Sequence, residues 1–245
     1  MADALTQYFD AVQRMQTRVF DSQRELLQQV AARMADTIAR EGRIYLFGTG
    51  HSHLLAVEAH HRAGGLAFAI PILATNLMLH ESTLLATDLE RTAGIAAPLL
   101  DRYQPRADDM LFVISNSGVN QVPVEMAHAG KTRGMWVVAV CAMEYAKHAP
   151  RSTFGKRLYE VADCTIDNGG MIGDAIVPLE GRTWRAASSS TVIGALLWNA
   201  LVAQTAYLLN ERGITPPIYI SSNVAGAEEH NAALQQVARV FNPHF

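Results

Sequence analysis

Short runs of apolar residues alternate along the chain with longer stretches in which apolar residues recur every three or four positions. The runs predict strands that are buried on both faces, and the periodic stretches predict amphipathic helices. Strands that alternate with helices indicate an α/β domain with a mainly parallel sheet. The strands expected for this sheet, the last of them at an edge, are residues 44–47, 66–73, 111–114, 135–140, 164–167 and 176–179.

A helical spacing of apolar residues covers residues 3–41 and predicts one long helix or two, ended by Gly42 as a C-cap. We expect this arm to pack against the core or against a second subunit. The chain is therefore divided into a helical N-terminal extension, residues 1–41, and an α/β domain, residues 42–245. Further helices are expected at residues 54–63, 82–100 (interrupted at Gly94), 122–133, 155–161 and 188–210, the last N-capped within residues 188–191, and a polar lid is expected at 142–154.

The turn after the first strand has the composition of a phosphate site. Gly48 and Gly50 flank Thr49 in a tight turn where side chains would obstruct a ligand, and a helix is expected to start near His51 or Ser52. The first N–H groups of such a helix, with the Ser52 hydroxyl beside them, favour an anion. An ordinary strand-to-helix turn is the simplest alternative.

A dinucleotide fingerprint is the nearest rival for this turn, and the residues disfavour it. His53 stands where the third glycine of that fingerprint is expected, and no acidic residue between Glu58 and Glu81 is available to bind a ribose hydroxyl.

A second polar turn follows the strand at residues 111–114. Ser115, Asn116, Ser117 and Gly118 end that strand, and Asn120 leads into the next helix. Parallel strands end at one edge of a sheet, so Ser52, Ser115, Ser117 and the Gly118 N–H are expected to meet there. Hydroxyls and backbone amides without a nearby Lys or Arg suit a phosphate held by many neutral donors. The alternative is a serine turn that only caps the helix.

Composition narrows the function classes. The 245 residues are 49% hydrophobic, enough for one sizeable core, and the net charge of −3 provides no basic field for nucleic acid. Cys141 and Cys164 show no disulfide or zinc spacing, which fits a reducing cytoplasm. The N-terminal residues do not resemble a signal peptide, and no apolar run approaches the roughly 18 residues of a membrane span. We expect a cytoplasmic protein without a membrane or nucleic-acid partner.

The GTGHS and SNSG turns, each after a strand, resemble the sugar isomerase (SIS) domain superfamily. Further stretches, among them MLHES, GKRLYEVAD and EEHN, are similar to a group of stand-alone SIS proteins named as phosphosugar isomerases. The resemblance implies a three-layer α-β-α sandwich with a five-stranded, flavodoxin-like sheet. It also implies a sugar phosphate ligand, no cofactor, and a homodimer or homotetramer.

The catalytic residues of phosphoheptose isomerases do not carry over to this chain. Arg62 stands where those enzymes keep a glutamate, and Asn199 stands where they keep a histidine. Isomerisation of a sugar phosphate still needs a general base and an acid. Glu81 is the first candidate for the base with His80 as its acid or orienting partner, although an ordinary first-turn acid explains Glu81 equally well.

Two further residues are weaker catalytic candidates. Glu58 is expected to pair with Arg62 at i,i+4, which favours a structural role. His230, in a C-terminal segment, resembles residues that complete SIS sites, in some cases from a neighbouring subunit.

The remaining histidines suggest no metal site. His51 and His53 are two residues apart, and His60 and His61 are adjacent, so neither pair presents both rings on one helix face. His51 is instead expected to hydrogen-bond the sugar or phosphate. The leading expectation is aldose–ketose isomerisation of a sugar phosphate. The alternatives are a lyase or etherase reaction on a sugar phosphate and non-catalytic sensing.

Overall fold

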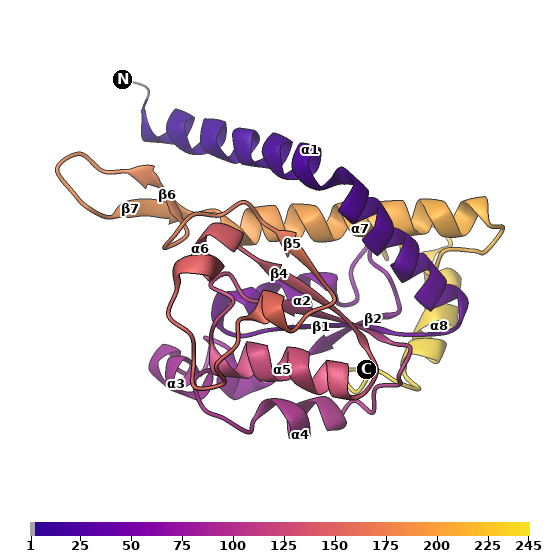
Figure 1. Cartoon of the computed structure of the whole chain (residues 1–245). Helices are drawn as coiled ribbons and strands as arrows, with labels where there is room; N and C mark the ends of the chain where they lie inside the picture. The colour runs from indigo at the N-terminus through magenta and orange to yellow at the C-terminus, as the bar shows by residue number, and fades with distance from the viewer. Residues whose placement is uncertain (1–2) are drawn as a thin grey trace.

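A five-stranded, all-parallel sheet forms the centre of the computed structural model, which describes residues 3–245 (Figure 1). The strand order is β2-β1-β3-β4-β5. The chain therefore starts next to one edge, forms that edge with β2, and then crosses β1 to add β3, β4 and β5 on the other side. The strands are β1 (Ile44–Gly48), β2 (Ala69–Ile72), β3 (Met110–Ile114), β4 (Trp136–Cys141) and β5 (Cys164–Asp167). The expected α/β class and parallel sheet are confirmed.

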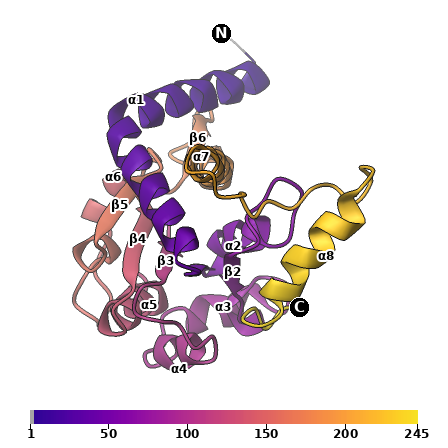
Figure 2. The same cartoon turned by 90° about the vertical axis from the view of Figure 1, so that its right-hand side faces the viewer.

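Side chains alternate between the two faces of this sheet, and each face is covered by helices. Ile44 and Leu46 belong to a core cluster with α1 (Ala4–Ala39), α2 (His53–Ala59) and α7 (Ser190–Glu211). The opposite face packs on α4 (Ala96–Asp101) and α5 (Gln121–Thr132), which Figure 2 shows on the other side of the strands. The molecule is therefore the expected three-layer sandwich.

The N-terminal arm is one helix of 36 residues, α1. It ends in a Schellman motif, in which the N–H of Glu41 bonds to Ile38 O and the N–H of Gly42 bonds to Thr37 O at 2.9 and 2.8 Å. Glu41, with φ of 58°, takes the left-handed position that the sequence assigned to Gly42. A Cβ at residue 42 would lie 2.7 Å from the Thr37 side chain, so close approach explains the glycine.

Helix α7 is long and apolar enough, by length and composition alone, to cross a membrane. The expectation that no apolar run reaches that length was therefore wrong. One side of α7 packs in the core, where the rings of Trp198 and Phe112 meet edge to face at 5.5 Å. Less than half of its most apolar stretch is buried in this chain.

Several smaller elements differ from expectation. The strand expected at an edge of the sheet, β6 (Ala175–Pro178), instead pairs with β7 (Arg185–Ser188) in a separate antiparallel hairpin that projects beside the start of α1 (Figure 1). Helix α2 stops at Ala59 because His60 is extended and His61 has φ of 42°. The remaining elements are α3 (Thr83–Leu89), α6 (Met143–His148), α8 (Ala227–Ala238) and the 3-10 turns η1 (Gly50–Ser52), η2 (Thr75–Leu77) and η3 (Leu158–Glu160).

Candidate functional site

The turn after β1 is built around two glycines. A Cβ on Gly48 would lie 2.5 Å from the Ser52 carbonyl carbon, and Gly50 has φ of +54°. The turn therefore folds back tightly enough to bring η1 and Ser52 over the end of β1. Because α2 has only seven residues, its dipole adds little to an anion site, and the Ser52 hydroxyl is the main local donor.

The loop after β3 is shaped by Ser115. This side chain is 5% exposed, and its Oγ accepts a hydrogen bond from the Gly118 N–H at 3.3 Å. Gly118 has φ of +62° and sits against Ala146, where a Cβ would be 3.2 Å from the Ala146 Cβ. Ser115 thus stabilises the loop, as in the serine turn that the sequence left open.

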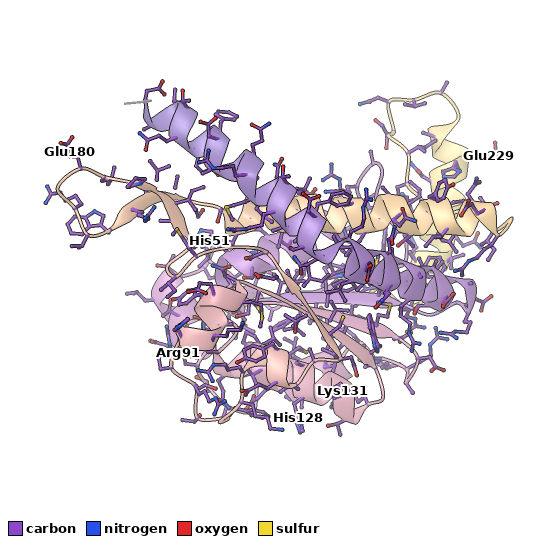
Figure 3. The ribbon with its side chains drawn as sticks, turned by 45° about the horizontal axis from the view of Figure 1, so that its top comes forward. His51, Arg91, His128, Lys131, Glu180 and Glu229 are labelled. Atoms are coloured by element: carbon purple, nitrogen blue, oxygen red, sulfur yellow. The ribbon has the colours of Figure 1, made fainter. Side chains whose placement is uncertain are left out.

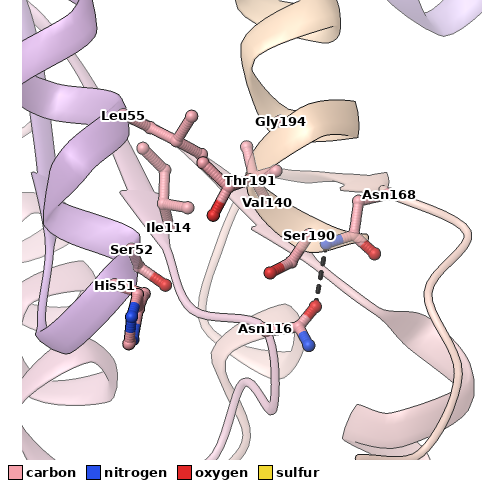
Figure 4. A pocket seen from close by; sticks show the side chains of 10 residues that line it. All are labelled: His51, Ser52, Leu55, Ile114, Asn116, Val140, Asn168, Ser190, Thr191 and Gly194. Atoms are coloured by element: carbon pink, nitrogen blue, oxygen red, sulfur yellow. Dashed lines mark hydrogen bonds between the residues drawn. The ribbon is translucent and has the colours of Figure 1, made fainter. Parts of the chain in front are cut away.

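A pocket opens where the two turns meet (Figure 4). The side chains of His51 and Ser52 lie on one side and that of Asn116 on another, while the start of α7 closes the third. Ser52 shares this pocket with Asn116. Of the residues expected to meet Ser52 here, Ser115 accepts from Gly118 instead, and Ser117 lies outside the lining. The lining residues of the pocket are His51, Ser52, Leu55, Ile114, Asn116, Val140, Asn168, Ser190, Thr191 and Gly194.

Asn168 is a site residue that the sequence analysis missed. It follows β5, is 4% exposed, and donates from Nδ2 to Asn116 Oδ1 at 2.9 Å. Its own Oδ1 accepts from the Gly170 N–H at 2.9 Å. The signal was present, because Asn168 and two glycines follow an expected strand in the same way as the two turns singled out above.

The start of α7 supplies the hydroxyls of Ser190 and Thr191. The expected serine N-cap is replaced by Asp174: Ser189 makes no side-chain cap, and Asp174 Oδ1 accepts from the Ser189 and Ser190 N–H groups at 3.2 and 2.9 Å. Asp174 Oδ2 also accepts from Ser190 Oγ at 2.6 Å. A residue outside the helix thus fixes the end of α7 that lines the pocket.

Ser117 and Asn120 face a second, larger hollow on the other side of the loop. Arg91 and Arg151 also line it. The expectation of a phosphate site without a nearby cation is therefore wrong for this half of the loop. The two arginines follow α3 and α6, so their approach to Ser117 depends on tertiary structure.

The first-choice catalytic pair lies outside the pocket lining. His80 and Glu81 are both exposed, between η2 and α3. The His80 ring is 6.0 Å from the ring of His53, centroid to centroid. His53 is buried and its Nδ1 donates to the carbonyl of Gly50, so His80 is linked to the first turn through a structural histidine.

Glu58 has the expected structural pairing. It forms an ion pair with Arg62, and its Oε1 accepts from Asn199 Nδ2 at 3.3 Å. Arg62 and Asn199, which the sequence analysis expected at the catalytic positions of phosphoheptose isomerases, therefore both contact one carboxylate on α2.

His230 lies in α8, and its Nε2–H donates to the Ile218 carbonyl at 2.8 Å. Figure 3 shows its neighbour Glu229 at the end of the molecule away from His51. Within this chain the structure does not bring His230 to the pocket.

Glu90 is a further carboxylate that the sequence analysis did not single out. Its side chain is 15% exposed and its Oε2 accepts from Thr49 Oγ1 at 2.8 Å, between the two glycines of the first turn. Its backbone carbonyl accepts from the Val122 N–H at 3.0 Å in α5. Glu90 thus connects the first turn to the start of α5. Among residues 3–245 no group of three or more His, Cys, Asp or Glu side chains is arranged to hold a metal.

Comparison with known proteins places these turns in a family. A family profile described as "SIS domain" matches residues 7–142. A UPF0309 protein of Halalkalibacterium halodurans is 40% identical over 231 residues, covering 94% of this chain and 92% of the relative. A UPF0309 protein of Geobacillus thermodenitrificans is 38% identical over 228 residues, covering 93% and 92%.

Solved structures share the fold at low sequence identity. A phosphoheptose isomerase of Francisella tularensis aligns with a TM-score of 0.54 at 13% identity, covering 82% of this chain and 95% of the enzyme. A phosphoheptose isomerase of Neisseria gonorrhoeae gives 0.51 at 18% identity, covering 84% and 97%.

Proposed function

Because the chain belongs to the UPF0309 family of SIS domain proteins, we propose that it binds a sugar phosphate and interconverts its aldose and ketose forms. The observation that carries this proposal is the meeting of the two polar turns, after β1 and after β3, at one edge of a parallel sheet. Open α/β sheets bind ligands at that edge.

The proposed ligand lies across the loop after β3. Its phosphate occupies the hollow beside Ser117 and Asn120, and the hydroxyls of its sugar reach into the small pocket, about 10 Å³, beside Ser52 and Asn116. The hydroxyls and amides of that pocket can both donate to and accept from sugar hydroxyls. The expected phosphate residues are thus divided between the two ends of one ligand.

His51 is the titratable side chain that lines the sugar pocket, and we assign it the proton transfer. Its imidazole is exposed, and histidine is the side chain that acts most often as a general acid or base. Glu81 and His80 remain candidates for a second group, because they follow η2 beside the first turn.

Binding is tested by thermal unfolding of the purified protein with a panel of sugar phosphates and the matching free sugars. A ligand that binds the native state raises the melting temperature by mass action. We expect at least one sugar phosphate to stabilise the protein while its free sugar does not.

Turnover is tested with that sugar phosphate in deuterium oxide. Proton transfer between adjacent carbons places solvent deuterium in the product, and His51→Gln should slow this exchange by at least about 100-fold while the sugar phosphate still binds. His128→Gln, an exposed histidine on α5, is the matched control. Exchange that is unchanged in His51→Gln would remove His51 from the mechanism, and release of a fragment from a 3-substituted substrate would instead indicate a lyase.

One observation favours a second function, sensing of a sugar phosphate without turnover. Among the described residues, no carboxylate lines the sugar pocket. Binding without deuterium exchange for any stabilising sugar phosphate would support the sensor.

The exposed side of α7 supports a homo-oligomer, a dimer or tetramer, as part of the same proposal. Leu196 is 42% exposed and Val192 is 42% exposed on a helix that is apolar all round. A reducing cytoplasm is proposed as the location, because Cys141 and Cys164 are both unpaired thiols.

A further inference from the structure

The hollow beside Ser117 and Asn120 differs in charge from the sugar pocket. Arg91 and Arg151 line it, and no acidic side chain of the described residues does. The sugar pocket has only neutral donors and His51. The two sides of one loop therefore differ in the ligand group they favour.

Both guanidinium groups are held in place by neighbouring residues. Arg151 pairs with Glu160, with 2.5 Å between Nη2 and Oε1. Arg91 donates from Nη1 to the Thr87 carbonyl at 2.6 Å, and the same nitrogen lies 3.9 Å from Glu90 Oε1. In these contacts each arginine uses one guanidinium nitrogen, and a guanidinium has five N–H donors, so others remain for a ligand.

The segment that carries Arg151 is fixed to the loop after β3 and to the start of α5. Gln121, 4% exposed at the start of α5, accepts at Oε1 from Thr153 Oγ1 and from the Phe154 N–H, both at 2.9 Å. The Leu158 N–H bonds to the Gly118 carbonyl at 2.8 Å. The segment expected to be a lid is therefore tied to the loop by hydrogen bonds that hold Arg151 over the hollow.

Two donors in the hollow have no partner among the described residues. The Ser152 Oγ is buried without a hydrogen-bond partner. The Asn120 side chain, at the N-cap of α5, makes no capping bond. A buried hydroxyl without a partner is costly, and an oxygen of a bound anion would satisfy it.

We propose that Arg91 and Arg151 bind the phosphate of the ligand, so that the protein selects phosphomonoesters, recognised as dianions, over uncharged sugars. This inference rests on the proposed function, because it assigns the residues that would hold the phosphate. The sequence suggests a phosphate held by uncharged hydroxyls and backbone amides. In this inference, charge-assisted hydrogen bonds from the two guanidinium groups contribute most of the binding instead.

The test uses inorganic phosphate as the probe and measures its dissociation constant by calorimetry with the full-length protein. Arg91→Gln and Arg151→Gln should each weaken binding about tenfold, because each removes a charge-assisted contact with the anion. Lys156→Gln is the matched control: Lys156 is exposed, five positions from Arg151, and outside the lining of the hollow. Arg151→Lys should restore part of the loss.

A second variant separates the ligand contact from the ion pair. Glu160→Gln removes the charge that pairs with Arg151 but keeps an oxygen that can accept from the Arg157 N–H, now bonded at 2.8 Å. If Arg151 acts only through that pair, Glu160→Gln should weaken phosphate binding as much as Arg151→Gln does. We expect Glu160→Gln to bind phosphate at least as tightly as the original protein.

The inference fails if the original protein binds phosphate and neither arginine variant is weaker, or if the protein binds no phosphate. In the first case, stabilisation by a sugar phosphate in the thermal screen leaves the proposed function standing. A protein that is stabilised by no sugar phosphate and binds no phosphate contradicts both.

Discussion

Asn168 and Asn116 are joined side chain to side chain, with 2.9 Å between Nδ2 and Oδ1. They follow β5 and β3, and β4 lies between these strands. The bond therefore connects two strand ends that are not neighbours and forms one wall of the sugar pocket (Figure 4).

Removal of this bond should weaken the ligand site more than the fold. We predict that Asn168→Ala loosens Asn116, lowers the affinity for the stabilising sugar phosphate about tenfold, and costs about 1 kcal/mol of stability. Calorimetry and urea unfolding measure the two effects. Asn210→Ala, at an exposed asparagine near the end of α7, is the control and should change neither.

Asp174 should stabilise the start of α7. Its carboxylate accepts from two backbone N–H groups, as a side-chain N-cap does, so its loss should cost about 1–2 kcal/mol in urea unfolding. Asp174 has φ of 67°, so Asp174→Gly removes the carboxylate without straining the backbone. Asp174→Asn keeps an acceptor oxygen and should retain most of the stability. Equal losses for Asp174→Gly and Asp174→Asn would show that the charge, and not the hydrogen bonds, is what matters.

Stability should depend on pH through His60. Burial, with smaller contributions from His244 and His61, lowers the pKa of His60 from 6.5 to about 4. In the unfolded chain this histidine binds a proton below pH 6.5, whereas the folded protein does not until about pH 4. Its contribution to stability is thus present above pH 6.5 and is lost as the pH falls toward 4.

The matched variant is His60→Phe, which keeps a ring beside Phe245, now 5.5 Å away between centroids. We predict that the free energy of unfolding of this variant falls less steeply with decreasing pH. Between these two pKa values the difference in slope should correspond to the uptake of about one proton on unfolding. Denaturant unfolding at several pH values gives the slopes. Identical slopes for the two proteins would contradict the role of His60.

The exposed side of α7 should form an interface between copies of the chain. Leu196→Asp places a charge on that side, away from the buried Leu197, and should shift the protein to monomers in light scattering. Val240→Asp is the control, because Val240 is 82% exposed beyond the end of α8. If the original protein is already monomeric, or if Leu196→Asp leaves its mass unchanged, α7 is not the interface.

The sequence predicted those parts of the site that depend on local pattern. The two polar turns each follow a buried strand, and parallel strands end at one edge, so the meeting of the turns follows from topology. The side chain that meets Ser52 is that of Asn116, whereas Ser115 and Ser117 were expected there. Ser115 was expected to bind a ligand but bonds to Gly118 N–H, because residues three apart in a tight turn reach each other first.

Contacts between distant segments were not predictable in this way. Asp174 reaches the start of α7 only because the hairpin of β6 and β7 returns the chain to that point. Arg91 and Arg151 look like ordinary surface charges in the sequence, and only the packing of α3 and α6 places them beside Ser117. Similarly, the residues around Asn116 and Ser117 in the sequence do not show that Asn116 lines the sugar pocket while Ser117 lines the hollow beside Asn120.

The most direct test of the central claim is a crystal structure of the protein with the sugar phosphate that stabilises it most. The account predicts the phosphate within hydrogen-bond distance of Ser117 and Asn120, and the sugar against Ser52 and Asn116. A phosphate bound away from the loop after β3 would contradict the assignment of this edge of the sheet as the ligand site.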